Sequence, residues 1–152
     1  MSDAASDEAY IRRAMVLAER AAAAGDVPIG AVLVCDGSTF EAWNEKERTP
    51  DATAHAEILV LRKAAAEVHA WRLSDATLYV TKEPCVMCAG AVVAARIKRL
   101  VFGCRDPKGG AAGSIVDIFE LPALNHRVAV TACVLESEAA AQLQEFFRQK
   151  RS

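Results

Sequence analysis

The feature that most constrains this chain is the alternation of short apolar runs with stretches of helical periodicity. Runs typical of strands lie at 27–37, 76–81, 97–104 and 128–135. Segment 39–45 follows an Asp36-Gly37 turn and is the expected hairpin partner of the first run. Apolar residues recur with helical spacing at 10–24, 54–68, 83–96 and 143–147. This order predicts an α/β fold: a three-layer α/β/α domain with a mixed five-stranded sheet.

Local signals indicate where three of the helices begin or end. Gly25 is expected to end the first helix. Asp51 or Thr53 is the expected N-cap of the helix at 54–68, because either side chain can accept a hydrogen bond from a free N–H of the first turn. Pro84 falls near the first turn of the helix at 83–96. A length of 152 residues without a linker-like segment indicates a single domain over 1–152.

Composition and charge exclude several classes of protein. Hydrophobic residues make up 53% of the chain and charged residues 25%, which is an ordinary globular balance. No apolar run approaches the ~18 residues of a transmembrane helix, so we expect no membrane association. The first ten residues are acidic, which predicts no signal peptide and a cytoplasmic location. A net charge of -2 excludes a broad nucleic-acid-binding field but leaves room for a local basic patch.

The five cysteines are expected to be free thiols, because their number is odd and no secretory signal accompanies them. Cys35, Cys104 and Cys133 lie in apolar, strand-like runs and are predicted to be small buried residues. Cys85 and Cys88 instead form a Cys-x-x-Cys at a helix start, where both side chains lie on one face. The helix dipole there favours the thiolate, the form that binds metal.

A zinc site requires more than these two cysteines. A structural site has four protein ligands, whereas a catalytic site has three and a water. The chain has no second Cys-x-x-Cys, and a single one also occurs in redox and structural sites. His69 and His126 have no cysteine or glutamate pattern around them and are predicted to be surface or capped histidines. His55 opens a helix and is followed by Glu57, and the full pattern His-x-Glu … Pro-Cys-x-x-Cys is much more specific.

The spacing of His55 and Glu57 predicts where the metal lies. Residues i and i+2 point about 200° apart around a helix, so the two side chains can converge only beyond the helix end. The metal is then expected between the first turns of the helices at 54–68 and 83–96, with Glu57 beside the water. Zinc lowers the pKa of bound water to about 7. Since one carboxylate can move protons to a ring nitrogen and then to a departing amine, the pattern predicts hydrolytic deamination of a base.

On these residues the chain resembles the bacterial tRNA-specific adenosine deaminases of the cytidine-deaminase superfamily, whose zinc signature has this form. The resemblance extends from about residue 10 to residue 148. The motifs "HAE" and "PCVMC" mark the superfamily, and "EPCVMCAGA", "GAAGS", "NHRV" and "FFR" are similar to the tRNA enzymes. The resemblance implies a cytidine deaminase-like fold and conversion of adenosine to inosine at the wobble position. It also implies one Zn²⁺ per subunit, no organic cofactor, and a homodimer that binds the tRNA anticodon stem-loop.

The resemblance also implies roles for individual residues. The expected zinc ligands are His55, Cys85 and Cys88, and Glu57 is the expected proton shuttle. Asn44 aligns with a contact to the flipped adenosine, and Asp106 with a residue near the anticodon backbone. Phe147 and Arg148 align with a C-terminal helix that faces the RNA. Ala52, Cys104 and Gly109 depart from the family pattern at positions that are expected to affect RNA affinity rather than the chemistry.

Basic residues provide an expected phosphate-binding surface. One group lies in the sequence around the fourth strand-like run and another at the end of the chain, and they comprise Arg96, Lys98, Arg99, Arg105, Lys108, Arg148, Lys150 and Arg151. If the two groups share a face, they form a basic patch on an otherwise acidic protein; the alternative is ordinary solvated charge. Phe146 is expected to pack in the core, whereas Phe147 fits core packing and base stacking equally well.

Two other functions fit part of the pattern. The chain could deaminate a free base or nucleoside such as guanine, cytosine or cytidine, a reaction that needs no basic surface. It could also be a non-catalytic RNA-binding subunit that retains zinc for structure alone. The second alternative leaves Glu57 without a role, because a glutamate shuttle is not a zinc ligand.

Overall fold

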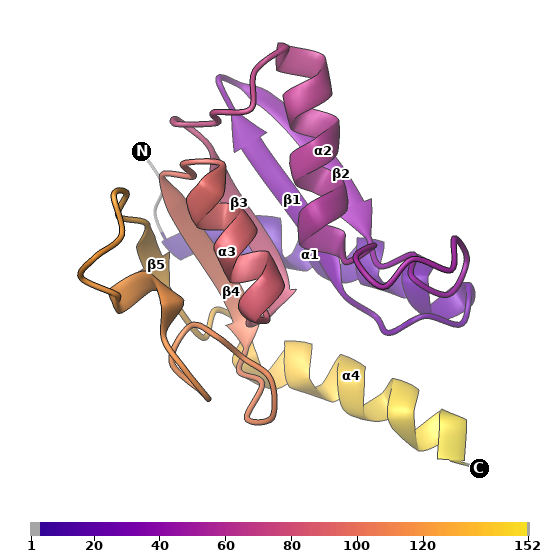
Figure 1. The fold of residues 1–152 in the computed structure, drawn as a ribbon. Helices are drawn as coiled ribbons and strands as arrows, with labels where there is room; N and C mark the ends of the chain where they lie inside the picture. The colour runs from indigo at the N-terminus through magenta and orange to yellow at the C-terminus, as the bar shows by residue number, and fades with distance from the viewer. Residues whose placement is uncertain (1–3, 152) are drawn as a thin grey trace.

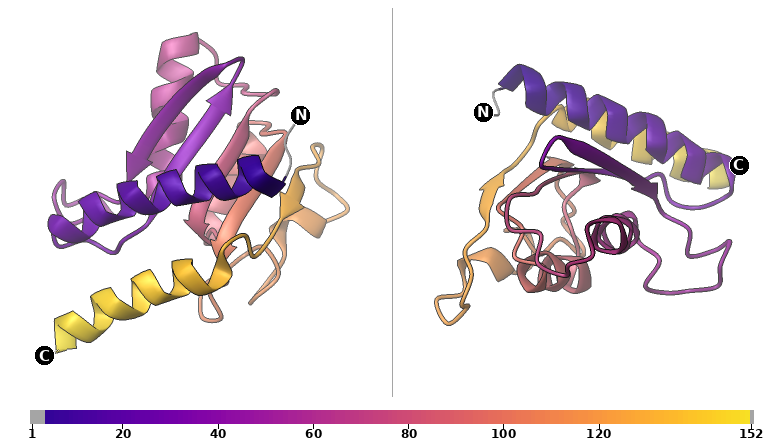
Figure 2. Two further views of the ribbon diagram at one scale, coloured as in Figure 1. Left: turned by 180° about the vertical axis from the view of Figure 1, so that it is seen from behind. Right: turned by 90° about the horizontal axis from the view of Figure 1, so that it is seen from above.

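A five-stranded sheet lies between two layers of helices in the computed structural model, which describes residues 4–151 (Figure 1). The strands are β1 (Gly30–Cys35), β2 (Ser38–Trp43), β3 (Thr77–Lys82), β4 (Arg99–Cys104) and β5 (Ala129–Thr131). The helices are α1 (Ala4–Ala23), α2 (Ala56–Val68), α3 (Val86–Ala94) and α4 (Glu136–Arg151), with a short 3₁₀ turn η1 (Ile118–Glu120). Helices α1 and α4 cover one face of the sheet, and α2 and α3 cover the other (Figure 2). The predicted three-layer arrangement is confirmed.

The strand order is β2-β1-β3-β4-β5. β1 is antiparallel to both of its neighbours, whereas β3, β4 and β5 are parallel, so the predicted mixed sheet of five strands is confirmed. Asp36 and Gly37 form the predicted two-residue turn between β1 and β2, with φ of 50° and 78°. Positive φ at both positions matches the right-handed twist of the hairpin.

The fifth strand is shorter than the predicted run over 128–135. Cys133 and Leu135 have φ of 64° and 57°, a left-handed conformation that interrupts an extended strand. Cys133 is exposed, so its predicted burial is wrong, whereas Cys35 and Cys104 are buried as predicted. Within the apolar run at 128–135, only Ala129–Thr131 form a strand, and the residues after it lead into α4.

Alternate residues of the central strands face opposite helix layers. Val32, Tyr79 and Val101 are neighbours in register and pack with the apolar stripe of α1. Leu33, Leu78 and Leu100 face the other way, into the larger core beneath α2 and α3. Helix α1 lies so close to β1 that a Cβ on Gly30 would stand 1.9 Å from the carbonyl oxygen of Ala14. Glycine is therefore required at that contact.

The helix boundaries agree with the prediction at α1 but not at α2. Gly25, with φ of 85°, follows the end of α1 as predicted. His55, not Asp51 or Thr53, is the N-cap of α2, and the predicted cap is wrong. Asp51 instead accepts hydrogen bonds from the N–H and hydroxyl of Thr53. The side chain of His55 makes no capping hydrogen bond. The N–H of Ala56 instead donates to the Oδ1 of Asn44 at 2.8 Å, so the side chain that caps the helix comes from the residue after β2.

Among residues 4–151, no helix combines the length and the apolar character that crossing a bilayer would require.

Candidate metal centre and active site

The candidate site lies where the first turns of α2 and α3 meet. His55 is the N-cap of α2, and Cys85 is the N-cap of α3. Cys88 lies one turn further along α3, on the same side. Both helices begin at the same end of the sheet, the end at which β3 finishes (Figure 1). The predicted meeting of the two helix starts is confirmed.

The geometry of these three side chains fits a metal ion. The Nδ1 atom of His55 lies 3.7 Å from the Sγ of Cys85 and 3.5 Å from the Sγ of Cys88. All three ligand atoms lie within 4.8 Å of one another. A tetrahedral zinc with bonds of about 2.3 Å to sulfur and about 2.0 Å to nitrogen has a sulfur–nitrogen edge of about 3.5 Å. The three residues therefore already stand at the separations that a shared metal requires.

The electrostatics of the two cysteines differ. Hydrogen bonds from the Cys88 thiol and from the His55 ring outweigh the effect of burial and lower the pKa of Cys85 to about 3. The hydrogen bond to Cys85, together with burial, raises the pKa of Cys88. Cys85 is thus the first thiolate of the pair, and its hydrogen bond with the His55 ring raises the pKa of that ring. A metal ion would replace these shared protons, because its thiolate ligands are deprotonated.

Glu57 is buried beside this group. The residue is 3% exposed, and in the described part of the chain its Oε1 is one of two buried side-chain polar atoms without a hydrogen-bond partner. Burial is the main cause that raises the pKa of Glu57 to about 7. A carboxyl group that gains and loses a proton near neutral pH is suited to general acid–base chemistry. An unpaired buried oxygen is costly unless a ligand or water supplies its partner.

Asn44 and Asp106 lie on either side of the group in the sequence. Asn44 is 3% exposed at the end of β2, and its Oδ1 accepts the hydrogen bond from the N–H of Ala56 that caps α2. Asp106 lies in the loop after β4 and forms an ion pair with Lys82 at 3.1 Å. Burial acts to raise the pKa of Asp106, but the hydrogen bond and charge of Lys82 hold it below its ordinary value. Both side chains are thus already fixed by protein contacts.

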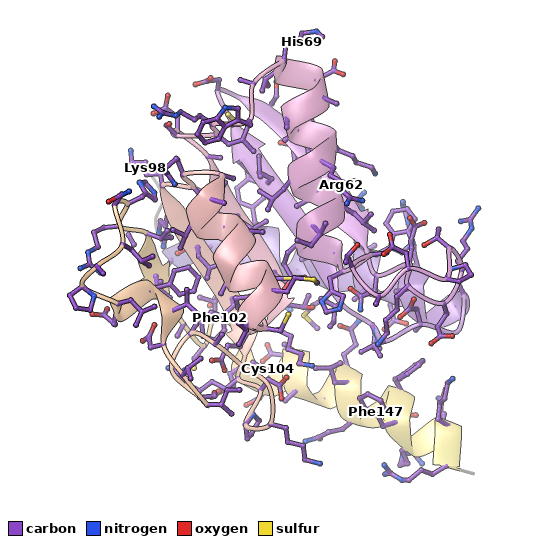
Figure 3. All side chains as sticks on the ribbon, viewed as in Figure 1. Arg62, His69, Lys98, Phe102, Cys104 and Phe147 are labelled. Atoms are coloured by element: carbon purple, nitrogen blue, oxygen red, sulfur yellow. The ribbon has the colours of Figure 1, made fainter. Side chains whose placement is uncertain are left out.

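Phe147 and Arg148 lie in the C-terminal half of α4, and Figure 3 labels Phe147 there. Phe147 is 42% exposed and meets Phe146 edge to face at 5.3 Å between ring centroids. Arg148 donates to both carboxylate oxygens of Glu145 on the same helix. Phe146 is half-buried and lines a groove of about 560 Å³ between α1 and α4, so its predicted place in the core holds only in part.

The predicted basic group around β4 is divided by the fold. Lys98 precedes β4 and Cys104 ends it, and the two stand at opposite ends of the strand (Figure 3). Arg99 is held at the first end by a bidentate ion pair with the buried Asp7. Arg105 and Lys108 follow the other end, at the side of the candidate site. Only these two members of the group can join the basic residues of α4.

The remaining histidines and the departures from the family pattern are not members of the metal group, which comprises His55, Cys85 and Cys88. His69 is exposed at the C-cap of α2, and His126 contacts the carbonyl oxygen of Ile97 through Nε2 at 2.7 Å, so their predicted roles as surface and capped histidines are confirmed. Ala52 is exposed, and a Cβ on Gly109 would lie 3.2 Å from the carboxylate of Asp106.

Sequence reasoning missed Glu83, which is 2% exposed and accepts hydrogen bonds from the loop of residues 105–114. The signal that could have found it is its place between an apolar strand and Pro84-Cys85. A charged residue at such a position is buried only if its charge is satisfied.

Comparisons with known proteins identify the family of this chain. The MafB19-like deaminase family matches residues 5–151. The tRNA-specific adenosine deaminase of Bacillus subtilis (strain 168) is 46% identical over 146 residues, which cover 95% of this chain and 91% of that protein. The chain belongs to the tRNA-specific adenosine deaminase family. The resemblance seen in the sequence is therefore confirmed, and the fold is the cytidine deaminase-like fold of that family.

Two solved structures refine the comparison. A structure from a study of A-to-I editing by tRNA:A34 deaminases at the wobble position of transfer RNA superposes with a TM-score of 0.85 at 46% identity. That match covers 89% of this chain and 99% of the other. A guanine deaminase from Nitrosomonas europaea superposes with a TM-score of 0.78 at 25% identity, covering 91% and 83%. Within the shared fold, this family member is more similar to the tRNA editing enzyme than to the free-base enzyme.

Proposed function

We propose that the protein is a zinc-dependent hydrolytic deaminase that converts adenosine to inosine at the wobble position of a tRNA anticodon. The observation that carries the proposal is the joint placement of the His55, Cys85 and Cys88 group and the buried, unpaired carboxylate oxygen of Glu57. The 46% identity with a tRNA-specific adenosine deaminase over 91% of its length supports the substrate.

In this proposal His55, Cys85 and Cys88 hold one Zn²⁺ per subunit. Three protein ligands are the number found in catalytic zinc sites, which leave a fourth position for water. When bound, zinc supplies a water whose pKa is lowered to about 7. The order of the cysteine pKa values supports entry of the metal, because Cys85 offers a thiolate before Cys88 loses its proton.

Glu57 carries the protons of the reaction. Its carboxylate takes a proton from the attacking water and gives it to the ring nitrogen of the adenine. The hydroxide of that water forms a C–O bond to the ring carbon that carries the amine. Glu57 then moves the proton of the new hydroxyl to the amine, the C–N bond breaks as the carbonyl of inosine forms, and ammonia leaves. The buried position of Glu57 supports this role, since it places the pKa of the group near neutral pH, where it can act as both base and acid.

Asn44, Asp106, Phe147 and Arg148 are the proposed substrate contacts. Asn44 lies next to the first turn of α2, where its amide can face a flipped base. Asp106 and the neighbouring Lys108 lie in the loop beyond β4, and the last two residues lie on α4. Single-stranded RNA is commonly read by aromatic stacking, which the exposed ring of Phe147 can supply.

A homodimer is part of the proposal. The outer surfaces of α2 and α3 form an apolar groove of about 310 Å³, lined by Ile58, Leu61, Arg62, Ala65, Trp71, Ala91, Ala94 and Ala95. Trp71 is 60% exposed, which is unusual for so large an aromatic side chain. A second copy of the chain would cover this surface.

A cytoplasmic location is also proposed, and the free thiols of the metal group fit a reducing compartment.

The activity is tested with a transcribed anticodon stem-loop that carries adenosine at the wobble position, followed by sequencing for inosine. We expect conversion at that position and no change in a stem-loop with adenosine elsewhere in the loop. Free guanine, cytosine, cytidine and adenosine are assayed beside it, since the 25% identity with a guanine deaminase makes a free base the second candidate. Deamination of a free base or nucleoside, together with no inosine formation on RNA, would refute the proposal and establish the second candidate.

A further inference from the structure

Glu83 is a buried carboxylate that joins the end of β3 to the loop of residues 105–114. Its Oε1 accepts hydrogen bonds from the N–H of Asp106 at 2.9 Å and from the hydroxyl of Ser114. Its Oε2 accepts from the N–H of Ala112 at 2.9 Å and from the N–H of Ser114 at 3.1 Å. One side chain therefore holds both the beginning and the end of the loop.

The loop sequence is adapted to this carboxylate. A Cβ on Gly110 would stand 2.3 Å from the carboxyl carbon of Glu83 and 2.4 Å from its Oε1. Real side chains do not approach so closely, so a glycine is required where the loop passes over the carboxylate. Gly110 also donates its N–H to the carbonyl of Asp106 at 2.9 Å, which closes the turn around Glu83.

The same loop is tied to the residues on both sides of Glu83. Asp106 forms its ion pair with Lys82, and Ala111 donates its N–H to the carbonyl of Pro84 at 2.8 Å. Pro84 directly precedes the metal-group residue Cys85. Three consecutive residues, 82–84, therefore fix where the loop stands relative to the first turn of α3.

We propose that Glu83 is a positioning residue that holds the loop of residues 105–114 as part of the RNA-binding surface. This inference rests on the proposed function. Glu83 contacts the loop and is not a member of the metal group, so it sets the affinity for the anticodon stem-loop rather than the rate of the chemical step. The loop presents Asp106 and Lys108 to the substrate, and Glu83 determines where they stand.

Glutamine at position 83 is the sharpest test, because it keeps the shape of the side chain while it removes the charge and one of the two acceptor oxygens. Each carboxylate oxygen faces two donors. An amide places an NH₂ group against one of these pairs. At the Oε2 position it leaves the N–H groups of Ala112 and Ser114 without an acceptor. At the Oε1 position the Ser114 hydroxyl can turn to accept, but the N–H of Asp106 is left unpaired, so at least one buried donor loses its partner in either orientation. The loop should then separate from β3 without removal of any metal ligand.

The experiment uses the full-length protein loaded with zinc. In Glu83→Gln we expect the KM for the anticodon stem-loop to rise about tenfold or more while kcat changes less than about threefold. We also expect the amides of Asp106, Ala112 and Ser114 to exchange with deuterium at least about tenfold faster, measured by NMR. An unchanged KM, a fall in kcat alone, or native exchange rates at these amides would overturn the proposal.

Asp7→Asn is the matched control. It makes the same carboxylate-to-amide change at a buried position, 4% exposed, but at the opposite end of the sheet, where Asp7 pairs with Arg99. We expect it to lower the melting temperature without raising the KM; an equal rise in KM would show that general destabilisation explains the result at Glu83. If the native protein forms no inosine, the proposed function fails, whereas the exchange rates still decide whether Glu83 holds the loop.

A double-mutant cycle with Gly110 provides a second test of the same contact. Gly110→Ala should raise the KM strongly in the native chain, because the new methyl group collides with the carboxylate. In a Glu83→Ala background the collision partner is gone, so Gly110→Ala should change the KM less than about twofold. Equal effects in the two backgrounds would show that the effect of Gly110→Ala does not arise from its contact with Glu83.

Discussion

At the scale of single residues, the proposed site assigns one histidine and two cysteines as metal ligands and one glutamate as the proton carrier. Glu57 lies two positions after His55, yet it is buried and its Oε1 lacks a partner. A ligand and a proton carrier can be told apart by experiment, because loss of a ligand removes the metal and loss of the carrier removes only the reaction.

Glu57→Gln should therefore lower the rate of inosine formation by about 10²–10⁴-fold, the usual contribution of a general acid–base group. Zinc content and affinity for the stem-loop should stay near the native values, measured by metal analysis and by fluorescence anisotropy. Glu8→Gln, an exposed substitution on α1, is the control and should retain full activity. Near-native turnover in Glu57→Gln would show that another group moves the protons.

Cys88→Ala tests the other class of residue. It removes a buried ligand, so the purified variant should contain less than about a tenth of the native zinc, and its melting temperature should fall because metal binding stabilises the folded state. Cys104→Ala deletes an equally buried thiol outside the metal group and should keep its zinc. Full zinc occupancy in Cys88→Ala would exclude Cys88 as a ligand.

At the scale of elements, the sequence was sufficient to predict the layers and the sheet, but not the residue that caps α2. The alternation of strands and helices depends on local periodicity, which the chain displays openly, and it predicted the layers and the sheet. The cap of α2 depends on Asn44, twelve positions away at the end of β2, and no local signal points to that contact. The division of the basic residues has the same origin, because the strand β4 separates Lys98 from Arg105.

The packing of α1 on the sheet predicts a dependence of stability on alkaline pH. Tyr79 is 2% exposed and donates its hydroxyl proton to Asp7 at 3.3 Å. Burial, followed by the charge of Asp7, raises the pKa of Tyr79 to about 12. An unfolded tyrosine has a pKa of about 10, so between those values the unfolded chain loses a proton that the folded chain keeps.

The free energy of unfolding should accordingly fall as the pH rises from about 10 to about 12, with a contribution from Tyr79 of at most about 2–3 kcal/mol. Chemical denaturation across this range measures it. Tyr79→Phe has no such proton and should lose this part of the decline, whereas Tyr10→Phe, which changes the neighbouring ring, should retain it. Parallel pH curves for Tyr79→Phe and the native protein would contradict the assignment.

At the scale of the whole molecule, the two helix layers differ in what they leave exposed. The layer of α1 and α4 carries charged residues along its groove, whereas the outer surface of α2 and α3 is lined mainly by apolar side chains. The sequence predicted a homodimer only through the family resemblance, since residues that form such a surface have the same helical spacing as core residues. The structure is needed to tell which apolar stripes face the core and which face outward.

Ala94→Glu should convert the proposed dimer into a monomer. Ala94 is exposed and lines the apolar groove, so a glutamate there would place two charges in the shared surface of a symmetric dimer. Sedimentation velocity should show the mass of one 16.3 kDa chain for this variant and twice that mass for the native protein. Ala66→Glu, an exposed position of α2 outside the groove, should remain dimeric. A native protein that sediments as a monomer would refute the dimer.

The hydrogen bond between Asn44 and the first free N–H of α2 limits how this enzyme can evolve. The proposed recognition of the base and the start of the helix that follows His55 depend on one side chain. Most replacements at position 44 that alter base choice would also remove the cap, at a cost of about 1 kcal/mol, and loosen a metal-group residue. Aspartate is an exception, because it retains a side-chain oxygen at the same reach. Since most other replacements lose the hydrogen bond to Ala56, new substrate preferences are more accessible through the loop and α4 than through Asn44.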